Sequence, residues 1–182
     1  NSDDKADSLA ILAGLYIKAG DKQTARQILA EALDIAKTIE KPLDKAGAVW
    51  RISEVGEVEN LEEALIIART IKPRASGYED RSWAYRELAE NFTRLGRNDR
   101  AKFVLDEAIL YLSTQKYDDN EQKELDLSFI GQLYAQAGFC DEALRLSNGF
   151  KNRARIAEIK RESAVCFAGN DQPKSAFATA SS

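Results

Sequence analysis

The stretch LAILAGLYIKAG, residues 9–20, sets the pattern from which the rest of this chain can be interpreted. Its apolar residues follow the i, i+3, i+4, i+7 spacing of one helix face: Leu9, Leu12, Ala13 and Tyr16. Gly20 follows, and glycine readily adopts the left-handed backbone that closes a helix. Asp21 can then cap a second helix. The segment from about Lys5 to Ile39 therefore predicts a helical hairpin.

The same unit returns further along the chain with both residue class and spacing preserved. The first copy contains Leu9, Leu12, Ala13, Tyr16, Gly20, Ala25, Leu29 and Ala32. The matching residues of the later copy are Tyr85, Leu88, Ala89, Phe92, Gly96, Ala101, Leu105 and Ala108. Part of a third copy follows Leu127, with Ile130, Gly131, Tyr134, Gly138 and Ala143. Such self-similarity indicates stacked structural repeats, because one hairpin cannot bury its apolar stripe alone.

Two variant copies complete the count. The segments ALDIAKTI (32–39) and ALIIARTI (64–71) are interpreted as the closing turns of the second helices of successive hairpins. For the second hairpin we expect helices at Leu43–Val58 and Leu61–Ile71, with Asn60 as cap and Glu63 as its capping-box partner. The last copy, after Arg153, is blurred. We expect a single domain over residues 1–182, with about five hairpins near 5–39, 43–71, 78–115, 120–147 and 152–180.

This pattern resembles the tetratricopeptide repeat (TPR), which places a large residue, Leu, a small residue, an aromatic, Gly and further apolar sites at fixed intervals. The eight residues from Leu9 to Ala32, and those from Tyr85 to Ala108, fit it well. The repeat spacing near 40 residues departs from the usual period of about 34, so a TPR-like variant is the better description. The resemblance implies an all-α fold, a right-handed α-solenoid, in which the first helix of each hairpin lines a concave groove.

Composition argues against most chemistry. Histidine is absent, which removes the usual acid–base residue near neutral pH and the commonest metal ligand. No Gly-x-Gly occurs, so a phosphate-binding loop of that kind is not expected. We therefore expect no enzyme activity, no cofactor and no metal. Cys140 and Cys166 lack the partners of a zinc site or a nucleophile dyad, and we expect them to be free, structural thiols.

Several weaker signals are present. Asp118, Asn120 and Gln122 have the first spacings of a calcium loop, but Lys123 and Phe129 stand where Gly and Glu are required. The glycosylation pattern at Asn91 lies mid-helix and is interpreted as accidental. Two basic clusters could bind an acidic peptide or could simply belong to an ordinary mixed surface. They are Arg94, Arg97, Arg100 and Lys102, and Arg145, Lys151, Arg153, Arg155, Lys160 and Arg161.

The candidate partner-binding residues come from the resemblance, carried over to the first helices of the repeats. They are Trp50, Arg51, Trp83, Arg86, Glu90, Arg94, Phe129 and Gln132. The two tryptophans are the main candidates, since aromatic residues and Arg concentrate at binding hot spots. Tryptophan is also a common core residue, so the alternative interpretation is packing.

The sequence thus favours a non-enzymatic module that binds a protein or peptide on the concave face, as a scaffold or adaptor. The alternatives are a regulatory or sensor segment of a larger enzyme, and a self-association module or homo-oligomer. The net charge of −4 gives no reason to expect nucleic acid or membrane binding. No signal peptide or membrane span is evident, so we expect a soluble protein of unknown compartment. The first residue is not Met, which suggests a processed protein or a fragment.

Overall fold

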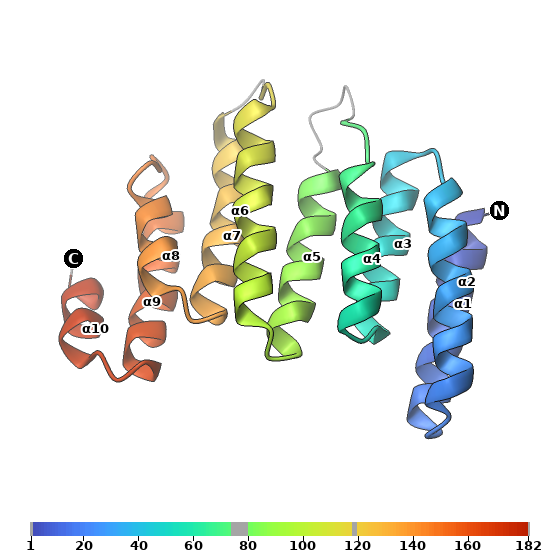
Figure 1. Cartoon of the computed structure of the whole chain (residues 1–182). Coiled ribbons are helices and arrows are strands. Elements are labelled where there is room, and N and C mark those ends of the chain that lie inside the picture. The colour runs from blue at the N-terminus through green and yellow to red at the C-terminus, as the bar shows by residue number, and fades with distance from the viewer. Residues whose placement is uncertain (1, 74–79, 118–119, 182) are drawn as a thin grey trace. The chain divides into compact units, whose positions relative to one another are not determined.

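A computed structural model describes residues 2–73, 80–117 and 120–181, which form ten α-helices and no β-strand (Figure 1). In chain order the helices are α1 (Ser2–Lys18), α2 (Lys22–Thr38), α3 (Pro42–Val55), α4 (Val58–Arg69), α5 (Asp80–Arg94), α6 (Asn98–Thr114), α7 (Asn120–Gln136), α8 (Cys140–Ser147), α9 (Arg153–Gly169) and α10 (Pro173–Ala180). The predicted all-α class is confirmed. Asp118 of the rejected calcium loop, and Tyr78 within the third expected hairpin, lie outside the described residues.

The chain divides into two compact units, Asn1–Leu95 and Gly96–Ser182, and each has its own packing. The third expected hairpin is split by this division, because α5 belongs to the first unit and α6 to the second. The expectation of one domain over residues 1–182 stays a prediction.

The first unit contains two layers of helices. The first helices of its repeats, α1, α3 and α5, pack side by side, and α2 and α4 pack against them and against each other. The layers meet through small, aliphatic and aromatic residues on helical spacing, as the repeat pattern requires. Fully buried examples are Ala13, Ala32, Ile52, Leu61, Leu88 and Phe92.

The second unit continues the same plan. Helix α7 packs against α6, α8 and α9, α8 also packs against α9, and α10 packs against α9. Tyr134 is 1% exposed at the position that Phe92 occupies in the first unit, and its hydroxyl donates to Asp106 Oδ1 at 2.5 Å. Burial and this hydrogen bond to a carboxylate raise the pKa of Tyr134. Phe92 is fully buried as well, whereas Tyr16, at the matching position of the first copy, is half-buried.

A repeated turn joins the helices of three hairpins. Gly20 has φ +86° and Gly138 has φ +91°, so both adopt the left-handed backbone expected of them. The residue after each glycine donates its N–H back to a carbonyl of the first helix, Asp21 to Tyr16 and Phe139 to Tyr134. The last hairpin repeats this bond, with Gln172 donating to Phe167, although Asp171 (φ +56°) replaces the glycine. Asparagine and aspartate tolerate this conformation better than most residues, so the turn is kept although the glycine that marks it in the sequence is absent.

The second hairpin differs from its prediction. Helix α3 ends at Val55 rather than Val58, and α4 begins at Val58 rather than Leu61. The cap is Glu57, not Asn60. Asn60 is instead the capping-box partner, and its Oδ1 accepts the Glu57 N–H at 3.0 Å. Gly56 permits this tight junction, because a Cβ there would lie 2.9 Å from the Ile52 carbonyl oxygen.

One residue of the opening stripe is exposed. Leu12 is 41% exposed, beside Ile11 at 55% and Leu15 at 56%. The prediction that Leu12 lies in the core is therefore wrong. Its equivalents in the later copies, Leu88 and Ile130, are fully buried.

Within the described ranges, no helix combines the length and the apolar character needed to cross a membrane.

Candidate partner-binding site

Two predicted site residues from neighbouring repeats meet on the surface of the first unit. Trp50 lies on α3 and Trp83 on α5, and their ring centroids are 5.8 Å apart with an interplanar angle of 48°. Both side chains are half-buried, so each indole keeps part of its surface accessible to solvent. Aromatic pairs at this separation attract each other by about 1 kcal/mol beyond area burial. The pair therefore both joins α3 to α5 and presents an aromatic surface.

Charged side chains border the two indoles. The Arg51 guanidinium lies 4.0 Å from the centroid of the Trp50 ring, a cation–π contact, and it also pairs with Glu54 at 3.2 Å. The Trp83 Nε1–H donates to Glu87 Oε1 at 2.9 Å. Burial raises the pKa of Glu87, and the Trp83 hydrogen bond opposes that rise only in part. The site thus has a cationic side at Arg51 and an anionic side at Glu87.

The Arg94 side chain is bonded to α3 rather than available to a ligand. Its Nη2 donates to the Glu54 carbonyl at 3.1 Å and lies 3.4 Å from the Ser53 carbonyl, at the C-terminal end of α3. A cation at this end of a helix interacts favourably with the helix dipole. Its Nε also donates to Asn91 Oδ1 at 3.0 Å. The side chain therefore fixes α5 to α3.

Asn91 completes this polar connection. Its Nδ2 donates to Ser53 Oγ at 3.1 Å and to the Glu87 carbonyl at 2.9 Å, and the residue is 7% exposed. A glycan attached to this buried Nδ2 would displace both hydrogen bonds, which supports the accidental interpretation of the glycosylation pattern.

The remaining candidates are not gathered at one place. Arg86 is half-buried and Glu90 exposed, both on α5 of the first unit. Phe129, 40% exposed, and Gln132, half-buried, lie on α7 of the second unit. The structure therefore brings together Trp50, Arg51 and Trp83, with Glu87 as an additional member. The binding role of all eight candidates stays a prediction.

The cysteines overturn one expectation. Cys140 and Cys166 form a disulfide, with a Cα–Cα distance of 5.6 Å, so the prediction of two free thiols is wrong. The bond links the start of α8 to α9 and lies beside the Asn170 side chain, whose Nδ2 donates to the Gly138 carbonyl at 3.0 Å. Sequence spacing offered no signal for it, because the two residues meet only once the hairpins are stacked.

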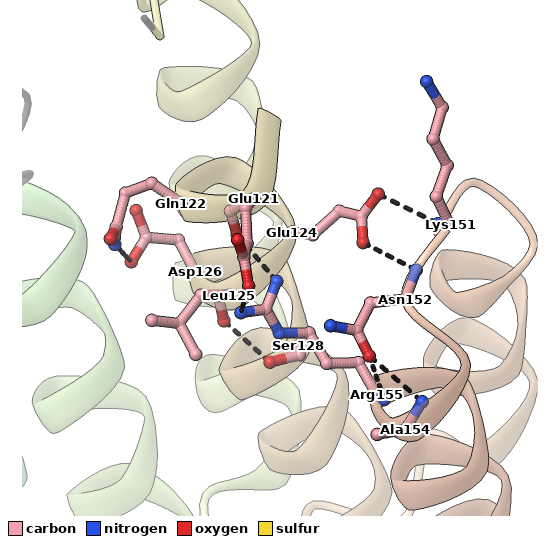
Figure 2. Close-up of polar contacts among 10 residues, drawn as sticks. All are labelled: Glu121, Gln122, Glu124, Leu125, Asp126, Ser128, Lys151, Asn152, Ala154 and Arg155. Atoms are coloured by element: carbon pink, nitrogen blue, oxygen red, sulfur yellow. Dashed lines mark hydrogen bonds and ion pairs between the residues drawn. The ribbon is translucent and has the colours of Figure 1, made fainter. Parts of the chain in front are cut away.

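Helix α9 is also held by side chains of α7, as Figure 2 shows. The Glu124 carboxylate accepts the backbone N–H groups of Lys151 at 2.9 Å and Asn152 at 3.1 Å, which lowers its pKa. Arg155 donates to the Glu121 carbonyl at 2.7 Å and pairs with the Glu121 carboxylate at 3.7 Å. Several members of the second basic cluster thus already meet acidic partners, among them Arg145 with Glu142. This pairing supports the ordinary mixed surface for that part of the cluster.

Among the residues that the structure covers, no three His, Cys, Asp or Glu side chains converge as a set of metal ligands. The site is therefore described by an aromatic pair, one stacked guanidinium and one partly buried carboxylate. Such an arrangement can bind by apolar contact and charge complementarity.

Comparison with known proteins supports the fold. No family model matches the sequence, and no curated protein matches it. Among solved structures, a putative kinesin light chain of Podosopora anserina with nearly identical TPR-like repeats has a TM-score of 0.52 at 18% identity, covering 94% of this chain and 90% of that one. A variant of the same protein gives a TM-score of 0.53 at 18% identity, covering 98% and 92%.

A second protein, Ton1535 from Thermococcus onnurineus NA1, has a TM-score of 0.52 at 16% identity, with 96% of this chain and 57% of that chain covered. Identities this low establish a shared fold and nothing further. TPR-like folds are typically non-catalytic and commonly bind protein partners. With its described helices, repeated hairpin turns and these neighbours, the chain is a TPR-like helical repeat protein in its fold.

Proposed function

We propose that this protein is a non-enzymatic interaction module that binds a protein or peptide on the concave face, at the surface formed by α3 and α5. The observation that carries the proposal is the half-buried tryptophan pair of Trp50 and Trp83. Interface hot spots are enriched in Trp and Arg and depend on a few residues. The repeat architecture supports it, since stacked first helices present an extended surface for an extended or helical ligand.

The charges around the pair suggest the ligand's chemistry. Arg51 on one side favours an acidic group, whereas Glu87 on the other favours a hydrogen-bond donor or a cation. An apolar or aromatic anchor of the ligand would then contact the indoles between them. The predicted contributions of Arg86 and Glu90 would come from α5, the helix that carries Trp83, whereas Arg94 of the same helix is already bonded to α3.

A selection from a random peptide library tests this directly. The Kd of peptides selected on the wild-type protein is then measured for the wild type and for the variants Trp50→Ala, Trp83→Ala and Arg51→Ala. Truncating a hot-spot tryptophan should weaken binding by about 2 kcal/mol, which is roughly a thirtyfold rise in Kd. The two tryptophans are the only ones in the chain, so intrinsic fluorescence reports on this site without a label.

The matched control is Phe103→Ala, which removes a 41% exposed aromatic from α6 of the other unit. This variant should bind the selected peptides as the wild type does. Equal binding by the three site variants, each shown to be folded by circular dichroism, would place the binding surface elsewhere.

A further inference from the structure

An open apolar groove lies between α9 and α10 in the second unit. Its volume is about 730 Å³, and its lining includes Ala164, Val165 and Phe177 with Arg153 and Lys160. Val165 is 65% exposed and Phe177 is 76% exposed. Leaving two large apolar side chains this exposed in one groove is unfavourable in water.

The equivalent groove of the preceding hairpin is filled. Helix α9 packs against both α7 and α8, as α3 packs against both α1 and α2 in the first unit. At the closest approach, a Cβ on Gly131 of α7 would lie 2.8 Å from Ile159 Cδ1 of α9. The shared turn aligns the hairpins, since Phe139 bonds to Tyr134 and Gln172 bonds to Phe167. By that alignment Ala164 corresponds to Gly131, so the open groove matches the position that α9 fills on the preceding hairpin.

Helix α1 has the complementary face. The residues by which α9 contacts the preceding hairpin include Ile159, against Gly131, and Cys166, bonded to Cys140. The turn residues Tyr16 and Phe167 align α1 with α9, and the matching positions on α1 are Ser8 and Leu15. This is the face where Ile11 is 55% exposed, Leu12 41% and Leu15 56%.

The charges of the two surfaces are also complementary. In the filled groove, Arg155 of α9 pairs with Glu121 of α7. The position on α1 that matches Arg155 is Asp4, which is exposed. The open groove carries Arg153 and Lys160 on its lining. The α1 face thus carries an acidic residue where the open groove carries basic ones, although the position aligned with Glu121 itself is Ala154.

We propose that copies of this protein associate head to tail, with the exposed face of α1 of one copy seated in the α9–α10 groove of the next. The interface is heterologous, so it leaves one open surface of each kind at the ends of an assembly. The weight-average mass should therefore rise with concentration from the monomer value of 20.2 kDa. These surfaces contain neither Trp50 nor Trp83, so the inference is independent of the proposed peptide site.

The test uses one variant blocked at each surface. Leu15→Arg places a charge on the α1 face, and Val165→Arg places one in the groove. The control Ile66→Arg alters a side chain of α4 that is 59% exposed and belongs to neither surface. Mass is measured by light scattering from micromolar to millimolar protein. The wild type, Ile66→Arg and Trp83→Ala should associate alike, and each blocked variant alone should associate more weakly, with Kd raised at least about tenfold.

Mixing gives the decisive result. Leu15→Arg keeps its groove and Val165→Arg keeps its α1 face, so an equimolar mixture should form a dimer that grows no further. The substitution Asp4→Arg should weaken association of the wild type, and adding Arg153→Asp to the same chain should restore it. The proposal is overturned if the wild type is monomeric throughout, if the mixture stays monomeric, or if the blocked variants associate as well as the control.

Discussion

The two units join a first helix to the preceding repeat by different kinds of contact. In the first, α3 and α5 are joined by an aromatic pair, Trp50 and Trp83, and by the hydrogen bond from Asn91 to Ser53. In the second, α9 is joined to the preceding hairpin by a close contact at Gly131, by the carboxylate of Glu124 and by a disulfide. One connection is noncovalent and leaves aromatic surface accessible. The other includes a covalent link.

This difference shows how little the repeat itself prescribes. Small residues at the helix contacts and one apolar stripe are enough to stack hairpins. The side chains at the edge of each contact can then serve another purpose. We place the peptide site where that edge carries indoles, and we expect the cross-linked joint to contribute chiefly stability.

The largest effect should come from removing the disulfide. Reduction, or the Cys140→Ser/Cys166→Ser pair, should lower the free energy of unfolding by about 3 kcal/mol, because the bond closes a loop with a sequence separation of 26 in the unfolded chain. Chemical denaturation followed by circular dichroism measures the loss. Adding reductant to the double variant is the control and should change nothing. Two titratable thiols in the unreduced, unfolded wild type would contradict the cross-linked joint.

A smaller effect should come from replacing glycines within helices by alanine, at an open position and at the close contact between Gly131 and Ile159. Gly47 lies within α3, and a Cβ added there would have no neighbouring atom within 4 Å, so Gly47→Ala should stabilise the protein by about 1 kcal/mol. Gly131→Ala should gain the same helix propensity, but the buried Ile159 must move to make room for the new methyl group. Its net gain in the free energy of unfolding should therefore be about 1 kcal/mol smaller than that of Gly47→Ala.

Shortening the partner side chain sharpens this comparison. Ile159→Val removes the Cδ1 atom that the new methyl group would meet, so the double variant should show a favourable coupling in a double-mutant cycle. Thermal or chemical unfolding of the four proteins measures it. Additive effects would mean that Gly131 is not required by the packing of α9.

The smallest effect should come from Glu87→Gln in the first unit. The pKa of Glu87 is raised in the folded protein, so ionised Glu87 disfavours folding. The contribution of Glu87 to the free energy of unfolding is therefore greatest below its pKa in the unfolded chain. It falls as pH rises through its pKa in the folded protein. Glu87→Gln removes that dependence and keeps an acceptor for Trp83, so the change at pH 7 should be under about 1 kcal/mol.

Tryptophan emission provides the measurement, because Trp83 bonds directly to this carboxylate. In the wild type, emission should titrate at a pH above the ordinary pKa of glutamate, and in Glu87→Gln this titration should be absent. An identical titration in both proteins would show that another group causes it.

Much of the fold was predictable because its determinants are local. The spacing of Leu9, Ala13 and Tyr16 indicates a helix, and Gly20 with Asp21 indicates its end and the next beginning; the structure confirms both turn and cap. The sequence signals for turns and caps failed where a different residue type occupies the turn or cap position. Asp171 takes the place of a glycine, and Glu57 caps α4 three residues before the expected Asn60.

The sequence by itself therefore determined the helices, their pairing within each unit and the small residues at their contacts, since all three follow from periodicity within one helix or between neighbours in the chain. Only the tertiary structure decided that Trp50 meets Trp83, that Cys140 bonds to Cys166 and that Leu12 is uncovered. The physical reason is that contacts between hairpins depend on the offset and rotation of one helix against another. Those quantities are set by the packing of the whole unit rather than by any single segment.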